Sequence, residues 1–414
     1  MKTDKHSVDF NKILSFDLEL TRDEKLRHMG AVLAERTLSL KINQDEAIHQ
    51  LDEMAGDADL ILGHNILDHD LPWIAKQRVR AQILLDKPII DTLYLSPLAF
   101  PANPYHRLIK DYKLVRDSIN DPVNDAKLSL QVFTEQICAL QEKPLAQLQL
   151  YQYLFEHGVA SHFSTRGMAS IFSALTGQAS ISAVVLPTLV KSVAQNKACP
   201  NQLNRVIGDA LKQPLRLLPL AFACAWLPVS GGNSVLPPWI WRRFPVTADI
   251  IRELREQNCQ SETCRYCCEN HDARRHLQKI FELNDFRKLP DGSPLQRNIV
   301  EYGLASRSLL GILPTSGGKS LCYQLPAIVR NLRNGSLTIV ISPLQALMKD
   351  QVDNLRHKAG IKGVEAISGM LTLPERGAIL EQVRKGDIAI LYLSPEQLRN
   401  RAVKQAIKQR QISG

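Results

Sequence analysis

Short apolar runs bounded by polar residues characterise the first part of the chain. Residues 12–20 (KILSFDLEL) are mostly apolar, with acidic side chains near their end, and they predict a buried strand. Residues 60–67 (LILGHNIL) predict a second strand that runs into a loop and a helix, and residues 88–95 (PIIDTLYL) form a third apolar segment. Mixed strands and helices of this kind predict an α/β layer fold for residues 1–135.

The pattern changes to helical spacing of Leu and Tyr from about residue 130 to residue 225. Residues 227–241 (LPVSGGNSVLPPWIW) are rich in Gly, Pro and Ser, which predicts a loop or linker. Short apolar runs then return at residues 308–313 (SLLGIL), 337–342 (LTIVIS) and 387–393 (DIAILYL), separated by helical stretches. This alternation is typical of βαβ units and predicts a parallel sheet.

Composition adds a broad class and a kind of partner. Hydrophobic residues make up 44% and charged residues 22% of the 414 residues, which is typical of a globular protein of two or three domains. No apolar run approaches the ~20 residues of a membrane span, and the N-terminus does not resemble a signal peptide, so a cytoplasmic protein with no membrane partner is expected. The net charge of +9 favours a polyanionic partner.

Acidic residues in the first α/β region have the spacing of a divalent-metal site. Asp17 and Glu19 lie two residues apart on a predicted strand, so both can point to one face. Two carboxylates on one face repel each other unless a cation lies between them. Asp70 follows in GHNILDHDLPWI (residues 63–74), and Asp125 follows in NDPVNDAKLSL (residues 120–130). Taken alone, the Asp-x-Glu pair is better explained as a solvated strand edge.

These three segments, in this order, resemble the DnaQ-like (DEDD) exonucleases. That family has an Asp-x-Glu strand, a His-Asn loop with an Asp, and a final Asp on a helix. The resemblance implies an RNase H-like domain and two-metal hydrolysis of a phosphodiester, with two Mg²⁺ or Mn²⁺ ions held by Asp17, Glu19, Asp70 and Asp125. Asp68 is the alternative to Asp70.

The family also places a His five residues, or a Tyr four residues, before the last Asp, and this chain departs from that pattern. The corresponding residues are Asn120 and Asp121, and neither offers an imidazole that titrates near neutral pH. His106, on the preceding segment, could substitute for it. With this departure, the sequence is consistent with an active nuclease site and with a degenerate one.

A phosphate-binding loop is predicted at residues 312–327 (ILPTSGGKSLCYQLPA), which follow a predicted strand and open a predicted helix. Backbone N–H groups at such a helix start face an anion. In this interpretation Lys319 reaches the β- and γ-phosphates and Ser320 ligates Mg²⁺. The strict loop pattern is not met because Leu313 stands at the first glycine position, so an ordinary turn is the alternative.

The segments that follow the loop, ISPLQALMKDQVDNL (341–355) and LYLSPEQL (391–398), complete a close resemblance to the RecQ-type superfamily-2 DNA helicases over residues 283–400. The resemblance implies ATP bound in an incomplete RecA-like domain. The implied nucleotide-binding residues are Gln296, Thr315, Ser316, Gly317, Gly318, Lys319 and Ser320, with Gln296 reading the adenine edge beside Phe286 and Arg287. The implied DNA-binding residues are Ser342, Lys349, Gln351, Ser394 and Glu396.

Four of the eight cysteines lie between Cys259 and Cys268, at a spacing suited to one metal ion. The expected ligands are Cys259, Cys264, Cys267, Cys268 and His271, holding Zn²⁺ or an iron–sulfur cluster. Reduced surface thiols are the alternative. The arginines nearby, which suit either a phosphate-facing surface or a solvated helix face, are Arg252, Arg255, Arg265, Arg274 and Arg275.

The expected organisation has four parts: a DnaQ-like exonuclease domain at 1–135, a helical connector at 136–250, a cysteine-rich knuckle at 251–282, and the N-terminal part of a RecQ-like ATP-binding domain at 283–414. The expected function is ATP-dependent DNA unwinding with a 3′–5′ exonuclease on single strands or 3′ ends, in DNA repair or recombination. The Asp-Glu-Ala-His motif is missing after residue 400, so this chain is expected to be a portion of a longer protein that alone lacks ATPase and helicase activity. The alternative is a non-catalytic DNA- and nucleotide-binding module with a degenerate nuclease site.

Overall fold

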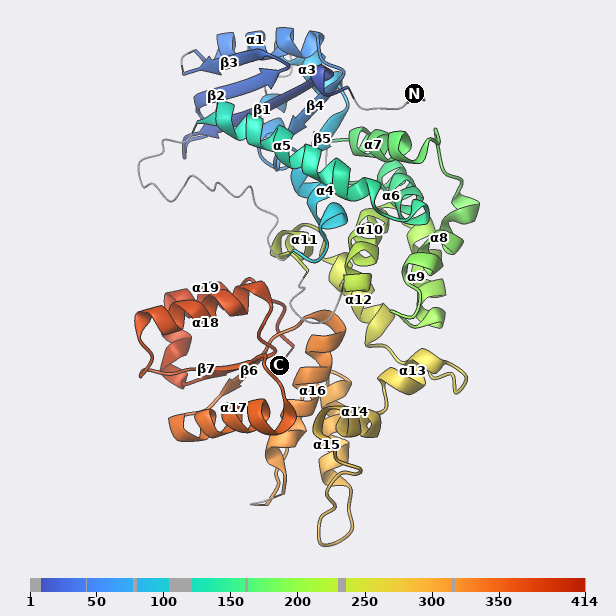
Figure 1. The fold of residues 1–414 in the computed structure, drawn as a ribbon, viewed down its shortest axis with the longest axis vertical. Helices are drawn as coiled ribbons and strands as arrows, with labels where there is room; N and C mark the ends of the chain where they lie inside the picture. Colours follow the sequence, from blue (N-terminus) through green and yellow to red (C-terminus); the bar gives the residue numbers. More distant parts are fainter. Residues whose placement is uncertain are drawn as a thin grey trace. The chain divides into compact units, whose positions relative to one another are not determined.

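The computed structural model describes residues 9–41, 43–76, 80–103, 121–160, 163–229, 236–314 and 317–413. The chain forms two compact units (Figure 1). Unit 1 comprises residues 1–101, 106–193 and 207–225, and unit 2 comprises residues 102–105, 194–206 and 226–414. None of the described helices is long and apolar enough to cross a membrane.

Unit 1 is built on a mixed five-stranded sheet with the order β3-β2-β1-β4-β5. Its strands are β1 (Ile13–Leu20), β2 (Leu26–Leu33), β3 (Arg36–Leu40), β4 (Leu60–Gly63) and β5 (Ile89–Asp91). β1 pairs antiparallel with β2 and parallel with β4, which places it at the centre of the sheet. The three apolar segments predicted in this region supply β1, β4 and β5, so the predicted α/β layer fold is confirmed.

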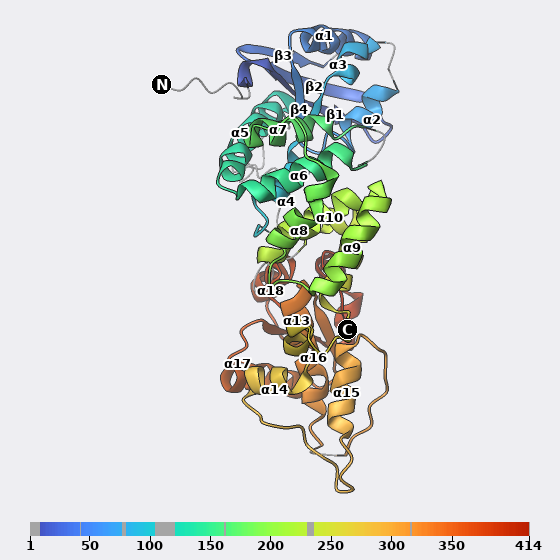
Figure 2. The ribbon, with the colours of Figure 1, turned by 90° about the vertical axis from the view of Figure 1, so that its right-hand side faces the viewer.

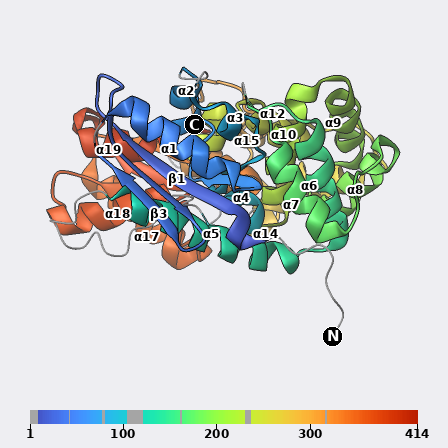
Figure 3. The same cartoon turned by 90° about the horizontal axis from the view of Figure 1, so that it is seen from above.

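Helices cover both faces of this sheet. They are α1 (Gln44–Gly56), α2 (Asp70–Ala75), α3 (Gln82–Asp86), α4 (Thr92–Ala99) and α5 (Pro122–Gln141). α1 and α5 lie on opposite faces, as Figure 3 shows. The first turn of α5 crosses β2 so closely that a Cβ atom at Gly30 would lie 2.1 Å from the backbone nitrogen of Val123. The Ser15 hydroxyl on β1 donates to the carbonyl of Ala126 at 2.9 Å and fixes the same turn.

The middle of the chain is helical, as its periodicity predicts. It contains α6 (Leu145–His157), α7 (Arg166–Thr176), α8 (Leu186–Val193), α9 (Pro200–Lys212) and α10 (Leu217–Trp226). α7 packs on the edge strand β5, because Gly167 has no side chain and a Cβ there would lie 2.2 Å from the carbonyl oxygen of Ile89. A covered edge strand is not available for pairing with another chain.

After residue 226, unit 2 contains the helices α11 (Pro238–Arg243), α12 (Val246–Arg255), α13 (Arg265–Asn270), α14 (Ala273–Phe281), α15 (Leu295–Leu304) and α16 (Lys319–Asn334). α15 packs along α16 (Figure 2). The predicted linker at residues 227–241 is thus partly wrong, because α11 starts within it. The Pro237–Pro238 pair does not prevent this helix, since proline is tolerated at its first position.

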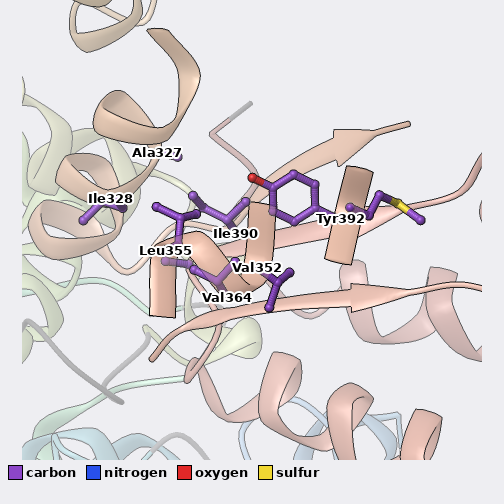
Figure 4. Close-up of a cluster of buried hydrophobic side chains, with 9 residues drawn as sticks. Ala327, Ile328, Val352, Leu355, Val364, Ile390 and Tyr392 are labelled. Carbon is purple, nitrogen blue, oxygen red and sulfur yellow. The ribbon is translucent and has the colours of Figure 1, made fainter. Parts of the chain in front are cut away.

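A parallel three-stranded sheet follows, with β6 (Thr338–Ile341), β7 (Val364–Ile367) and β8 (Ile390–Leu393) in the order β6-β8-β7. Its helices are α17 (Gln345–Ala359), α18 (Leu373–Lys385) and α19 (Arg401–Ile407). Figure 4 shows side chains of α16, α17 and the strands packed in one buried cluster, which includes Ile328, Val352 and Ile390. The predicted parallel sheet is therefore confirmed for two of its three predicted strands, and residues 364–367 add a strand that the sequence analysis did not identify.

The prediction of a strand at residues 308–313 is wrong, because these residues join no sheet. An open cleft of about 620 Å³ separates them from β6 and is lined by both segments. Leu310 and Ile312 are 88% and 78% exposed. An apolar run becomes a strand only where a neighbouring strand offers backbone partners, and the cleft keeps β6 out of reach.

Candidate functional site

The start of α16 has the geometry of a phosphate loop. Gly318 precedes the helix in the left-handed conformation (φ 75°), and Lys319 and Ser320 are its first two residues. A Cβ atom at Gly318 would lie 2.1 Å from the side-chain nitrogen of Gln296, so both the backbone angle and the close approach require glycine here. Thr315 and Ser316 of the predicted set lie outside the described residues.

Gln296 is buried and joins this loop to the segment before it. Its side-chain oxygen accepts a hydrogen bond from the backbone N–H of Arg287 at 2.7 Å. Its side-chain nitrogen donates to the carbonyl of Gly318 at 3.1 Å. The structure therefore brings Arg287, Gln296 and the loop together. A base recognised by Gln296 would exchange these two internal hydrogen bonds for its own.

Two of the predicted DNA-binding residues lie at the carboxyl ends of neighbouring parallel strands. Ser342 follows β6 and Ser394 follows β8, and the backbone N–H of Ser342 donates to the carbonyl of Leu393 at 3.0 Å. The hydroxyl of Ser394 donates to the Glu396 carboxylate, which lowers the pKa of that exposed group. Ligands of open α/β sheets bind outside the carboxyl ends of the strands. Lys349 is exposed on α17.

Gln351, another of the predicted DNA-binding residues, has partners inside the protein. Its side-chain oxygen accepts hydrogen bonds from Gln324 at 2.8 Å and from the Tyr323 hydroxyl at 3.4 Å. The Tyr323 and Tyr392 hydroxyls lie 3.1 Å apart. This polar network joins the phosphate-loop helix α16 to α17 and β8, so Gln351 holds these elements together.

The four predicted nuclease carboxylates lie on elements that meet at β1. Asp17 and Glu19 are on β1, Asp70 is the first residue of α2, and Asp125 is in the first turn of α5. Asp70 accepts a hydrogen bond from the backbone N–H of Leu18, between the two β1 acids, at 3.1 Å. Among the described residues, however, no carboxylates form a set of three or more close enough to share an ion.

Electrostatics at these carboxylates suit a positively charged ligand. One carboxylate oxygen of Glu19 is buried and, within the described part of the chain, has no hydrogen-bond partner. Burial raises the pKa of Asp70, while its hydrogen bond with His69 lowers it. A buried anionic oxygen without a donor is costly, and a divalent ion would offset that cost. The donor chemistry thus suits Mg²⁺ or Mn²⁺, but within the described residues the spacing does not bring three of these carboxylates to one ion.

Two histidines that the sequence analysis did not single out lie beside this site. Nδ1 of His69 lies 3.5 Å from the Asp70 carboxylate, which raises the pKa of His69. His64 lies 2.8 Å from the Thr92 hydroxyl, and burial lowers its pKa to about 4 although the charge of Asp125 opposes the shift. The signal that could have identified them is their place in the Gly-His-Asn loop and beside Asp70.

The residues at the usual general-base positions have other roles or lie outside the described residues. Asp121 caps α5, with its carboxylate accepting from the N–H of Val123 at 3.1 Å. Asp68, the alternative to Asp70, accepts a hydrogen bond from the Tyr94 hydroxyl at 3.1 Å. Asn120 and His106 lie outside the described residues.

The third site is a cluster of four thiols from Cys199, Cys259, Cys264 and Cys267, whose sulfur atoms all lie within 4.8 Å of one another. The structure thus brings Cys199 to three of the five predicted ligands, while the other two, Cys268 and His271, are not in the set. Cys268 is exposed, and its sulfur lies 3.3 Å from the carbonyl oxygen of Glu262. Burial opposes ionisation of Cys259, yet N–H groups of Ser261 and Asn201 help to lower its pKa to about 6.

The arginines around the cysteines separate into two kinds. Four are exposed and paired with acids, as Arg252–Asp249, Arg265–Glu269, Arg274–Asp285 and Arg275–Asp272. These pairs agree with a solvated helix face. Arg255 is 5% exposed and donates to the carbonyls of Lys197, Arg333 and Leu227 at 2.8, 2.6 and 3.1 Å. Arg255 is therefore structural.

Comparison with known proteins bears on the last part of the chain. Residues 293–412 match the DEAD/DEAH box helicase family, so this region, with its phosphate loop and parallel sheet, is part of a DEAD/DEAH box helicase domain. Within that class, the region is related to the RecQ helicases. The remaining residues have no support from these comparisons for an exonuclease domain.

Three relatives show the extent of the similarity. The ATP-dependent DNA helicase RecQ of Synechocystis sp. is 38% identical over 136 residues, which are 33% of this chain and 26% of that protein. The probable ATP-dependent DNA helicase RecS of Bacillus subtilis is 36% identical over 136 residues, 33% of this chain and 25% of that protein. The RecQ helicase of Haemophilus influenzae is 36% identical over 124 residues, 30% of this chain and 18% of that protein. The chain thus spans about a quarter or less of these relatives.

Proposed function

We propose that this chain is part of a RecQ-like, ATP-dependent DNA helicase that also carries a metal-dependent 3′–5′ exonuclease domain of RNase H-like fold. The observation that carries the helicase assignment is the phosphate loop at Gly318–Ser320, held by Gln296 inside a region related to RecQ helicases. The net charge of +9 agrees with a nucleic acid partner.

ATP binds where the N-terminal end of α16 meets Gln296. Backbone N–H groups at the helix start receive the phosphates, and Lys319 supplies a positive charge to the β- and γ-phosphates. Ser320 would hold Mg²⁺, whose charge offsets that of the phosphates. Ser342 and Ser394 face the DNA strand at the carboxyl ends of β6 and β8, with Lys349 and Glu396 beside them. Gln351 supports this site indirectly, because it accepts hydrogen bonds from Tyr323 and Gln324 on α16.

The exonuclease assignment rests on the placement of Asp17, Glu19, Asp70 and Asp125 on elements that meet at β1 and on the buried, unpartnered oxygen of Glu19. These carboxylates would hold two divalent ions, which supply an activated water and stabilise the leaving oxygen of a phosphodiester. Asp70 is fixed by the Leu18 N–H, and Asp125 by the close packing of α5 on Gly30. A non-catalytic binding module is the alternative, because the positions that usually carry the water-orienting His or Tyr hold Asn120 and Asp121.

Asp17→Asn is expected to lower exonuclease activity by about 100-fold or more, because it removes an anionic metal ligand. The assay follows single-stranded DNA labelled at its 5′ end, with Mg²⁺ or Mn²⁺, for a ladder that shortens from the 3′ end. Asp23→Asn, an exposed acid in the turn after β1, is the matched control and keeps full activity. Absence of shortening by the unmodified chain with either metal would favour the binding module.

Lys319→Ala is expected to weaken ATP binding by about tenfold or more, because a charge-assisted contact with the phosphates is lost. Binding is measured by titration of a fluorescent ATP analogue with Mg²⁺. Lys404→Ala, an exposed lysine on α19, is the control. The nuclease activity stays unchanged in Lys319→Ala, and ATP binding stays unchanged in Asp17→Asn. If one substitution lowers both activities, the assignment of two separate sites is wrong.

A further inference from the structure

The four clustered thiols have the dimensions of a site for one ion. The sulfur atoms of Cys199 and Cys264 lie 3.8 Å apart. A tetrahedral zinc ion with Zn–S bonds of about 2.3 Å separates its sulfurs by about 3.8 Å. An iron–sulfur cluster carries its thiolates on different iron atoms and would hold them farther apart. The compact set therefore favours a single tetrahedral ion over a cluster.

Backbone and side-chain hydrogen bonds hold the thiols in place. The N–H of Cys199 donates to the carbonyl of Leu254 at the end of α12 at 3.0 Å, which fixes Cys199 beside the other three. The side-chain nitrogen of Asn201 donates to the sulfur of Cys259 at 3.3 Å, and the N–H of Cys259 donates to the sulfur of Cys267 at 3.5 Å. Donors aimed at sulfur are the outer-shell contacts that metal-bound thiolates use.

Charge gives a second, independent argument. Four thiolates around Zn²⁺ leave two uncompensated negative charges, which a buried site must balance. Arg255 and Arg333 are both 5% exposed, and neither forms an ion pair with a carboxylate among the described residues. Arg255 donates to the carbonyl of Lys197, two residues before Cys199, and Arg333 donates to the carbonyl of Asn270, three residues after Cys267. These two buried guanidinium groups, bonded to the segments that carry Cys199 and Cys267, match the charge that zinc would leave.

We propose that Cys199, Cys259, Cys264 and Cys267 bind one structural Zn²⁺ ion, and that Cys268 and His271 are not ligands. The ion ties the residue before α9 to the α12–α13 segment. That segment in turn holds the C-terminal end of α16, because Arg255 donates to the Arg333 carbonyl and Arg333 donates to the Asn270 carbonyl. The zinc site thus anchors the far end of the helix that begins with Lys319. The proposal stands whether or not the nuclease is active.

The experiment measures metals in the purified full chain by mass spectrometry and compares two single-thiol variants. We expect one equivalent of zinc and a colourless protein. Cys199→Ser should lower zinc affinity by about 100-fold or more, whereas Cys268→Ser, which removes the predicted thiol closest to the set in sequence, should retain one equivalent. Cobalt substitution of the unmodified chain should give the thiolate charge-transfer absorption of a tetrahedral Cys₄ site. This measurement does not depend on whether either variant folds.

Each other outcome overturns the proposal. Zinc retained in Cys199→Ser and lost in Cys268→Ser would show that the sequence-local ligand set is right. Stoichiometric iron with acid-labile sulfide and a brown colour would show a cluster. A metal-free wild-type chain that takes up neither zinc nor cobalt would show four reduced thiols packed in a core.

Discussion

Replacing Arg255 by methionine is expected to destabilise unit 2 by about 3–5 kcal/mol, the largest effect on stability that we predict. The guanidinium of Arg255 donates to three carbonyls from separate segments, at Lys197, Leu227 and Arg333. Methionine fills a similar volume but donates no hydrogen bond, so two buried carbonyls, of Leu227 and Arg333, and the partly buried carbonyl of Lys197 lose their donor. Burial already lowers the pKa of Arg255, so part of the loss is offset by removing a buried charge.

Arg252→Met is the matched control, because Arg252 lies one turn earlier on the same helix. Its side chain is 57% exposed and pairs with Asp249 at 3.2 Å, an interaction worth at most about 0.5 kcal/mol. The measurement is the hydrogen-exchange protection of α12 and α16, read by mass spectrometry. It reports the stability of unit 2 by itself, whereas a thermal melt of the whole chain combines both units. Equal protection in the two variants would mean that the carbonyls find other donors and that Arg255 is dispensable.

The same three contacts show what the sequence could and could not reveal. Arg255 and Arg252 look alike on a helix rich in charge, and both were grouped with arginines that could face phosphate. Burial distinguishes them, and burial depends on segments far away in the chain. Cys199 is a similar case, since it precedes Cys264 by 65 residues and no local spacing marks it as a ligand. Local patterns instead favoured Cys268 and His271, which are near in sequence but do not belong to the four-thiol set.

Elements whose formation depends on local pattern were predicted well. β1 and β4 follow from apolar runs of strand length, and the helical spacing of the middle region follows from amphipathic periodicity. The start of α16 follows from glycines that allow a tight turn before a helix. Residues 308–313 have an equally apolar pattern, yet they form no strand, because pairing needs a neighbour at β6. Sheet membership is a tertiary property that the run itself does not encode.

Gly30→Ala is expected to lower the proposed exonuclease activity by about 100-fold and the stability of unit 1 by about 2–3 kcal/mol. The added Cβ would lie 2.1 Å from the nitrogen of Val123 and 2.3 Å from the carbonyl carbon of Pro122. Both contacts are with backbone atoms, which cannot rotate away as a side chain could. The first turn of α5 must therefore shift, and Asp125 shifts with it, away from Asp17 on the neighbouring strand.

Gly56→Ala is the control, because nothing lies within 4 Å of a Cβ atom at that position on α1, and alanine there should stabilise the helix by about 0.5–1 kcal/mol. The measurements are 3′-end shortening of 5′-labelled DNA and thermal unfolding of each variant. A shift of Asp125 can be distinguished from a loss of stability, because far below the melting temperature both variants are folded. A difference in activity measured there reports the geometry of the site alone. Full activity in a destabilised Gly30→Ala would mean that Asp125 tolerates the shift, and that the meeting of α5 with β2 supports the fold without aligning a metal site.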